Sequence, residues 1–262
     1  MTRVLDRIVF EIRLDLAKRR EKVPLSVLEA RARKAPKVRS LVGALKKPGV
    51  GLMAELKAKS PSAGLIRPRY DVAGGARAYA RAGARALSVL TEPRFFGGKL
   101  EDLPLARRIS HLPVLRKDFI VDPYQVVEAR AFGADAVLLI VRLLTDWELA
   151  TLQKLAWDLK MDALVETHTA AELARAKKMG ARLIGINSRN LDTLTIDPRA
   201  FARLVPLAPR GAVLVAESGI KTPEDVVRLA RMGVHGMLVG ESLLKEKDLK
   251  TAARILVAAG KD

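Results

Sequence analysis

Several residue types and patterns are missing from this chain of 262 residues, and each absence narrows what the protein can be. Cysteine is absent, which excludes a disulfide framework, a thiolate metal site and a cysteine nucleophile. Aromatic residues make up only 4% of the chain, so its core must be mainly aliphatic. No run of eighteen apolar residues occurs, and the first residues lack the apolar stretch of a secretory signal. We therefore expect a soluble cytoplasmic protein without a membrane span.

Acidic residues are also few relative to basic ones, with 29 Asp and Glu against 47 Lys and Arg and a formal net charge of +18. Such a charge attracts anions of every size. The basic residues are spread along helical segments and are not gathered with stacking aromatics, so we expect no nucleic-acid partner. They can simply keep the helices soluble, but their field also favours a small anionic substrate. Scarce asparagine and glutamine, with abundant arginine, hint at a thermophilic source.

Residues 1–47 differ from the rest of the chain. Apolar residues recur at helical spacing from Leu5 to Leu16 and predict an amphipathic helix that ends near Arg20. Three prolines punctuate the remainder, which we expect to hold one more short helix at about 40–46. We interpret this segment as a helical extension packed on a single domain of residues 1–262, in a monomer or a weak homo-oligomer.

From Val50 onward the chain repeats one unit, in which a helical pattern ends at a glycine and an apolar strand follows. Glycines at 83, 133, 180 and 233 suit the left-handed cap of such a helix. The expected helices include 71–82, 122–132, 146–159, 169–179, 198–205 and 222–232. The expected strands lie near 50–57, 86–90, 113–117, 135–141, 161–166, 182–187, 212–217 and 236–240. Eight such units predict a closed (β/α)₈ barrel. A doubly wound open sheet is the alternative, but no Gly-x-Gly-x-x-Gly motif follows an early strand.

The first strand places Glu55, Lys57 and Lys59 at alternate positions, so their side chains share one face. An unpaired buried charge costs about 3 kcal/mol or more, so this face must open to water or pair its charges. A solvated edge strand would explain one such face. However, Lys117, Glu166, Asn187 and Glu217 stand at the ends of other strands. The carboxyl ends of barrel strands meet at one mouth, which predicts an active site there.

The mouth offers two kinds of chemistry. Glycines after the seventh and eighth strands allow backbone N–H groups to approach a phosphate. Interleaved lysine and glutamate side chains shift one another's pKa values and suit general acid–base catalysis. Alternatively, the same charges form a ring of structural ion pairs, or a lysine forms a Schiff base. The spacing of the three histidines shows no metal-binding pattern, so we expect no metal site and no cofactor.

Several motifs, in the same order along the chain, resemble those of the indole-3-glycerol phosphate synthase family. The first is AELKAKSPS at 54–62, and the others lie at 87–98, 115–120, 164–168, 186–191 and 216–220. The resemblance implies a carboxy-lyase of tryptophan biosynthesis. Its reaction closes the indole ring of 1-(2-carboxyphenylamino)-1-deoxyribulose 5-phosphate and releases CO₂ and water.

The resemblance also implies roles for individual residues. Lys117 would be the general acid that protonates the substrate carbonyl oxygen, and Glu166 would assist dehydration by proton transfer. Lys57 would also be catalytic, Glu55 and Asn187 would position these groups, and Glu217 would lie beside Lys57 and tune it. The expected substrate contacts are Ser60, Arg189 and Lys59 for the carboxylate, Ser218, Gly219 and Gly240 for the phosphate, and Phe96, Phe119 and Leu138 for the aromatic ring.

Glu241 departs from the pattern, because some relatives carry a small hydroxyl residue there. A carboxylate would repel a phosphate, so we expect its side chain to turn away while its N–H stays available. Three other functions stay open at this point: a Schiff-base aldolase, the neighbouring isomerase of the same pathway and a basic nucleic-acid-binding module. The isomerase resembles this chain less and usually uses a cysteine.

Overall fold

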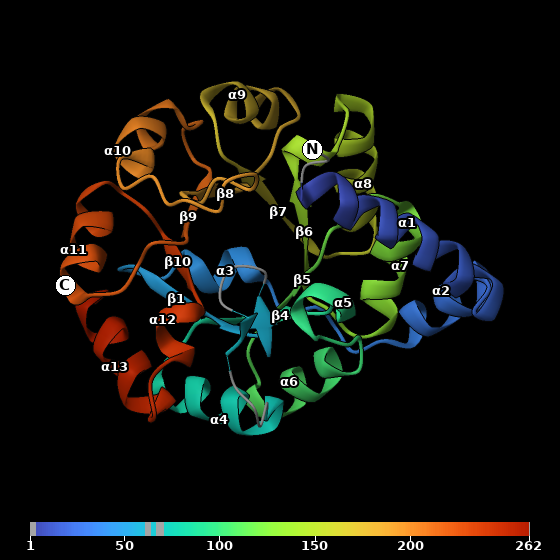
Figure 1. Ribbon diagram of the computed structural model, residues 1–262, viewed down its shortest axis with the longest axis horizontal. Coiled ribbons are helices and arrows are strands. Elements are labelled where there is room, and N and C mark those ends of the chain that lie inside the picture. The colour runs from blue at the N-terminus through green and yellow to red at the C-terminus, as the bar shows by residue number, and fades with distance from the viewer. Residues whose placement is uncertain (1–3, 61–63, 67–70, 262) are drawn as a thin grey trace.

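The computed structural model describes residues 4–60, 64–66 and 71–261. In this part of the chain, eight parallel strands form a closed barrel in the order β1-β10-β9-β8-β7-β6-β5-β4 (Figure 1). The predicted (β/α)₈ barrel is thereby confirmed. Its strands are β1 (Gly51–Leu56), β4 (Ala86–Leu90), β5 (Val114–Lys117), β6 (Ala136–Ile140), β7 (Asp162–Thr167), β8 (Leu183–Asn187), β9 (Val213–Glu217) and β10 (Gly236–Val239).

Helices form the outer ring around these strands (Figure 1). The four predicted glycine caps, at 83, 133, 180 and 233, all have positive φ. Asp122 and Thr222 cap the helices that begin at Pro123 and Pro223, where proline at the first helical position is tolerated. The ring contains α4 (Val72–Ala82), α6 (Asp102–Ser110), α7 (Pro123–Ala131), α8 (Asp146–Asp158), α9 (Ala170–Lys178), α10 (Ala200–Leu204), α11 (Pro223–Arg231) and α13 (Leu249–Ala259). Shorter elements are α5 (Pro93–Phe96), α12 (Glu241–Leu244), η1 (Val141–Leu143) and η2 (Val205–Leu207).

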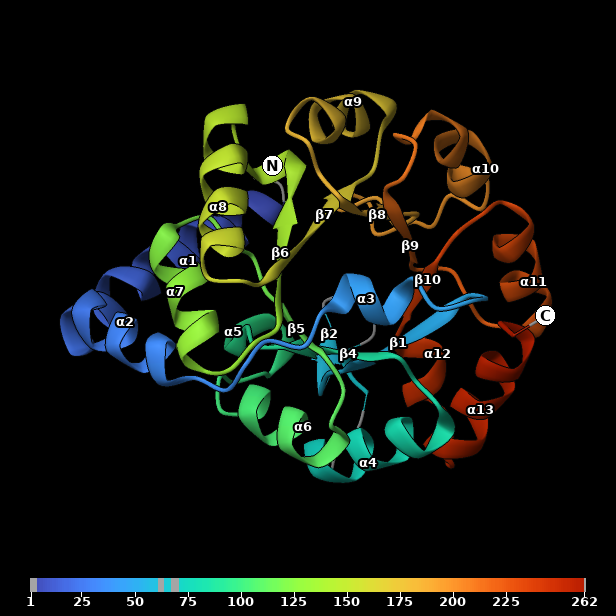
Figure 2. The same ribbon diagram turned by 180° about the vertical axis from the view of Figure 1, so that it is seen from behind.

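The barrel interior is apolar up to the ends of its strands. Side chains such as Met53, Leu115, Leu164 and Val215 fill it. At the amino-terminal end, α3 (Leu41–Leu45) lies across the barrel, as Figure 2 shows from behind, and buries Leu41 and Leu45 in the same cluster. The amino-terminal end of the barrel is therefore closed, and polar side chains can gather only at the carboxyl ends of the strands.

The N-terminal extension is more helical than its sequence predicts. Helix α1 (Val4–Lys22) was expected, but α2 (Leu25–Lys34) was not, because Pro24 looked like a break. Proline is tolerated directly before a helix, where its missing N–H costs nothing. Leu28 of α2 packs with Leu16 of α1 and with Tyr124 on α7. The extension thus lies against the outer ring at α7 (Figure 1). That the whole chain behaves as one domain stays a prediction.

Two further details of the sequence interpretation are wrong. The predicted helix at 198–205 begins only at Ala200, because Asp197 accepts a hydrogen bond from the Arg199 N–H in a turn that precedes the helix. The first strand ends at Leu56, and Lys59 lies instead in a short antiparallel hairpin of β2 (Lys59–Ser60) and β3 (Gly64–Leu65). The alternation that links Glu55 to Lys57 therefore does not extend to Lys59. Pro61 and Ser62, which complete the first motif, lie outside the described residues.

Candidate active site

A cavity of about 1150 Å³ opens at the carboxyl ends of the barrel strands. Most of the residues that sequence analysis assigns to a site line it, although they are spread over nearly two hundred positions. Those residues are Glu55, Lys57, Phe96, Lys117, Phe119, Leu138, Glu166, Asn187, Arg189, Glu217, Ser218, Gly219, Gly240 and Glu241. Since β5, β7, β8 and β9 each end in one of these polar residues or just beyond it, the fold itself gathers them.

Lys117 stands at the centre of this cavity. Its Nζ lies 2.6 Å from Oε2 of Glu166 and 2.8 Å from Oε2 of Glu217. Both carboxylates are almost completely buried. Asn187 donates from Nδ2 to the other oxygen of Glu166 at 3.2 Å. One ammonium group therefore holds two buried carboxylates.

Because Glu166 and Glu217 share one ammonium group, the pKa values of their carboxyl groups are driven apart. Burial alone would raise both. For Glu166, Lys117 and His168 outweigh burial and hold its pKa below the usual range. For Glu217, burial and the neighbouring charge of Glu166 prevail over Lys117 and raise its pKa to about 8. Burial would lower the pKa of Lys117, but the charges of Glu166 and Glu217 raise it well above its usual value.

Two glycines make room for these carboxylates. A Cβ on Gly185, in the middle of β8, would come 2.1 Å from Oε1 of Glu217. A Cβ on Gly240 would come 2.3 Å from Oε1 of Glu55. Sequence analysis expected Gly240 but missed Gly185. A glycine inside an otherwise apolar strand is the signal that could have found it, because such a position often marks a close approach.

The second lysine of the mouth has a different partner from the one expected. Lys57 Nζ lies 2.6 Å from Oε1 of Glu55. Glu217 was predicted to lie beside Lys57, but it binds Lys117 instead. The reason is topological: Glu217 pairs with Asn187 in the barrel register, and its side chain reaches across the interior to β5.

The wall of the cavity near β8, β9 and β10 carries the residues expected to meet anions. Ser218 and Gly219 both have positive φ, so the chain turns sharply there. Arg189 lies 3.4 Å from Oε2 of Glu241, and Lys245 binds the other oxygen of Glu241 at 2.8 Å. Glu241 is thus neutralised by two cations. Its expected rotation away from a phosphate stays a prediction.

An apolar side faces this polar wall. The rings of Phe96 and Phe119 lie 6.0 Å apart between centroids, tilted by 45°. Leu138 lines the cavity with them. A flat aromatic group could pack on this side while its charged substituents face the opposite wall.

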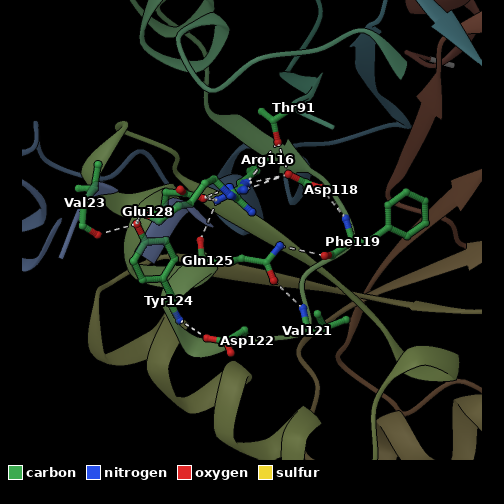
Figure 3. Close-up of polar contacts among 11 residues, drawn as sticks. Val23, Thr91, Arg116, Asp118, Phe119, Val121, Asp122, Tyr124, Gln125 and Glu128 are labelled. Atoms are coloured by element: carbon green, nitrogen blue, oxygen red, sulfur yellow. Dashed lines mark hydrogen bonds and ion pairs between the residues drawn. The ribbon is translucent and has the colours of Figure 1, made fainter. Parts of the chain in front are cut away.

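A buried network anchors the segment that follows Lys117, and Figure 3 shows it. Arg116 is completely buried and lies 2.9 Å from both Asp118 and Glu128. Gln125 accepts a hydrogen bond from the Val121 N–H and donates one to the Phe119 carbonyl. These contacts hold residues 118–121, and with them Phe119, at the cavity edge. Sequence analysis did not assign Arg116 a role.

Two predicted substrate contacts do not line the cavity. Lys59 donates to the carbonyl oxygen of Arg94 at 2.6 Å, outside the mouth. Ser60 is buried in the β2–β3 hairpin. The structure therefore does not bring either of them together with Arg189. Among the described residues, no group of three histidine, aspartate or glutamate side chains could hold a metal ion. No helix in this part of the chain has the length and apolar character needed to cross a bilayer.

Comparisons with known proteins agree with this arrangement. The barrel resembles a 3-hexulose-6-phosphate synthase from Salmonella typhimurium, with a TM-score of 0.64 over 80% of this chain and 98% of that one, at 13% identity. An orotidine 5'-phosphate decarboxylase from Pyrococcus horikoshii gives 0.63 over 80% and 99%, at 9% identity. These likenesses establish the fold alone.

Sequence comparisons go further. An indole-3-glycerol phosphate synthase of Mycobacterium sp. (strain KMS) is 47% identical over 98% of this chain and 94% of its own length. One from Parafrankia sp. (strain EAN1pec) is 45% identical over 98% and 96%. The family model for indole-3-glycerol phosphate synthase matches residues 5–256. The chain therefore belongs to the indole-3-glycerol phosphate synthase family.

Proposed function

We propose that this chain is a carboxy-lyase that closes the indole ring of 1-(2-carboxyphenylamino)-1-deoxyribulose 5-phosphate, in tryptophan biosynthesis. The observation that carries the proposal is the position of Lys117 between Glu166 and Glu217 inside one cavity. The cavity also offers an apolar side for an aromatic ring and cations for two anionic groups.

In this proposal Lys117 is the general acid of ring closure. As the aromatic carbon bonds to the substrate carbonyl carbon, the ammonium gives its proton to the carbonyl oxygen, and loss of CO₂ restores the aromatic ring. Glu166 and Glu217 raise the pKa of Lys117, which favours the ammonium form that a general acid needs. This supports the acid role over the Schiff-base alternative, which requires a neutral amine.

Glu166 then assists dehydration by proton transfer, so that the new hydroxyl group leaves as water. Its short contact with Lys117 offers a path on which the proton can move between the two groups. Asn187 and Glu55 position Glu166 and Lys57, their respective partners. Lys57 is also catalytic in this proposal. Glu217, whose pKa is raised to about 8 by burial and by Glu166, tunes Lys117 and not Lys57.

We also assign the substrate contacts. Phe96, Phe119 and Leu138 hold the aromatic ring, and Arg189 binds its carboxylate. Ser218, Gly219, Gly240 and the backbone N–H of Glu241 bind the phosphate. Ser60 and Lys59 remain candidates for the carboxylate only if the β2–β3 hairpin moves toward the cavity when substrate binds.

The test is to add the carboxyphenylamino-deoxyribulose phosphate to the purified chain and to follow indole fluorescence, with no metal or cofactor added. Product formation supports the proposal, and its absence contradicts it. Borohydride treatment with the substrate present tests the aldolase alternative, because a covalent adduct on Lys117 would contradict its acid role. The expected cytoplasmic location, weak or absent self-association and thermophilic source also stay proposals, to be checked by fractionation, sedimentation and thermal melting.

A further inference from the structure

His168 lies directly behind Glu166, and the function proposed above does not use it. Its side chain is 8% exposed. Nε2 lies 3.3 Å from Oε1 of Glu166, and Nδ1 lies 3.2 Å from Oε2 of Glu172. Within the described residues, Nε2 makes no hydrogen bond of good geometry, although it is buried. A buried nitrogen that faces one carboxylate at this distance suggests an electrostatic role toward it.

The local sequence explains how the imidazole is held there. Glu166 and His168 are two residues apart at the end of β7, so both side chains leave the same side of the chain. Thr169 caps α9 by accepting a hydrogen bond from the Glu172 N–H at 3.2 Å. The Glu172 carboxylate folds back and accepts a hydrogen bond from the backbone N–H of His168 at 2.7 Å. The same carboxylate oxygen therefore closes the start of the helix and faces the imidazole.

The carboxylates of Glu166 and Glu172 favour the protonated, positively charged form of His168. Burial would lower its pKa, but the interactions with Glu166 and Glu172 outweigh burial and raise the pKa to about 9. In the described part of the chain these are the charged groups that act on His168, while Lys117 and Glu217 face Glu166 from β5 and β9. At neutral pH Glu166 thus has one positive charge on each side.

We propose that His168 is a positioning residue for Glu166, and that Glu172 fixes it in this role. The imidazolium attracts Oε1 electrostatically at 3.3 Å and the Asn187 amide donates to it, so that Oε2 is left to exchange a proton with Lys117 and the substrate. Because a neighbouring cation favours the carboxylate form, His168 also helps Glu166 release a proton that it has taken up. This inference rests on the proposed role of Glu166 in dehydration.

The test compares H168Q and E172Q with a matched control, H111N, in the fluorescence assay across pH. Asparagine suits the control position, because His111 has a φ of 59°. Loss of the His168 charge should raise the pKa of Glu166 and move the acid limb of the kcat profile to higher pH. We expect the acid limb of the H168Q profile to move up by about one pH unit, so that kcat at a pH on that limb falls about ten-fold while kcat near neutrality and KM stay within about two-fold. E172Q should show the same change at smaller size, and H111N none.

A double variant separates positioning from a structural role. If His168 acts through Glu166, adding H168Q to E166Q should lower kcat no further. The inference is overturned if H168Q folds and keeps the parent kcat and pH profile, or if it lowers kcat equally in both backgrounds. Should H168Q not fold, E172Q decides by the same pH criterion. A parent chain that forms no product would overturn the proposed function itself, so the two failures are distinguishable.

Discussion

Arg116 and Lys117 are neighbours on β5, yet their side chains leave opposite faces of the strand and meet carboxylates in different ways. Arg116 lies 2.9 Å from both Asp118 and Glu128, and also donates to the Gln125 carbonyl oxygen at 2.8 Å. Lys117 has two carboxylates that compete for one ammonium group, and Oε1 of Glu217 has no hydrogen-bond partner among the described residues.

This difference separates the ion pairs of Arg116, which stabilise the fold, from those of Lys117, which can take part in proton transfer. Each charged group around Arg116 has a fixed partner, so proton transfer between these groups is not favoured. Around Lys117 the pKa of Glu166 is lowered and the pKa of Glu217 is raised from the usual value for a glutamate. Two neighbouring acids with different pKa values are the arrangement that suits proton transfer. The comparison predicts that substitutions on one face of β5 will affect stability and those on the other will affect rate.

The largest expected effect is on the reactive face. K117A and E166Q should each lower kcat by about ten-fold to ten-thousand-fold, because each removes a positioned acid or base. K154A is a control, since Lys154 is exposed and pairs with Asp158 one turn along its own helix. Steady-state fluorescence assays measure the effect. Full activity of either variant would remove that residue from the mechanism.

On the structural face, R116M should destabilise the fold by about 3–5 kcal/mol, because it removes the cation that pairs with buried Asp118 and one of the two cations that pair with buried Glu128. R203M is the matched control, since Arg203 is exposed and its ion pair should contribute at most about 1 kcal/mol. Chemical denaturation of the three proteins gives the comparison. A stable R116M with reduced kcat would reverse the assignment of the two faces.

A smaller effect tests which cations of the mouth meet substrate. R189A should raise KM about ten-fold, the value of one charge-assisted contact of about 1.4 kcal/mol. K59A should change KM little, because Lys59 is engaged by the Arg94 carbonyl outside the cavity. Equal changes in KM would contradict the conclusion that Lys59 does not meet the substrate.

The smallest effect concerns pH. The pKa of Glu217 is raised in the folded chain to about 8, so folding favours its protonated form. Its stability contribution is complete below the ordinary value of about 4.3 and is lost as the pH rises through about 8. The Tm of the parent should therefore fall more between pH 5 and pH 9 than the Tm of E217Q. Parallel Tm curves would contradict the raised pKa.

Much of this site could be predicted because the relevant signals are local. Glu166, Asn187 and Glu217 end their strands in the sequence, and barrel topology alone puts strand ends together. Gly185 and His168 were not assigned a role. A glycine inside an apolar strand could have marked Gly185, and the two-residue spacing could have placed His168 beside Glu166. The approach of Glu217 to Gly185 and of Glu172 to His168 joins different elements, and no periodic pattern encodes it. Helix α2 was missed because Pro24 can both end one helix and precede another.

The sequence by itself determined the eight repeated units, the apolar interior and the residue types at the mouth, because hydrophobic periodicity and strand ends are properties of neighbouring residues. The tertiary structure decided which charges pair: Glu217 with Lys117, Lys57 with Glu55, and Lys59 with a backbone carbonyl outside the cavity. Pairing depends on side-chain reach across a closed barrel. Differences of one or two ångströms there, which only the packed chain sets, select one partner over another.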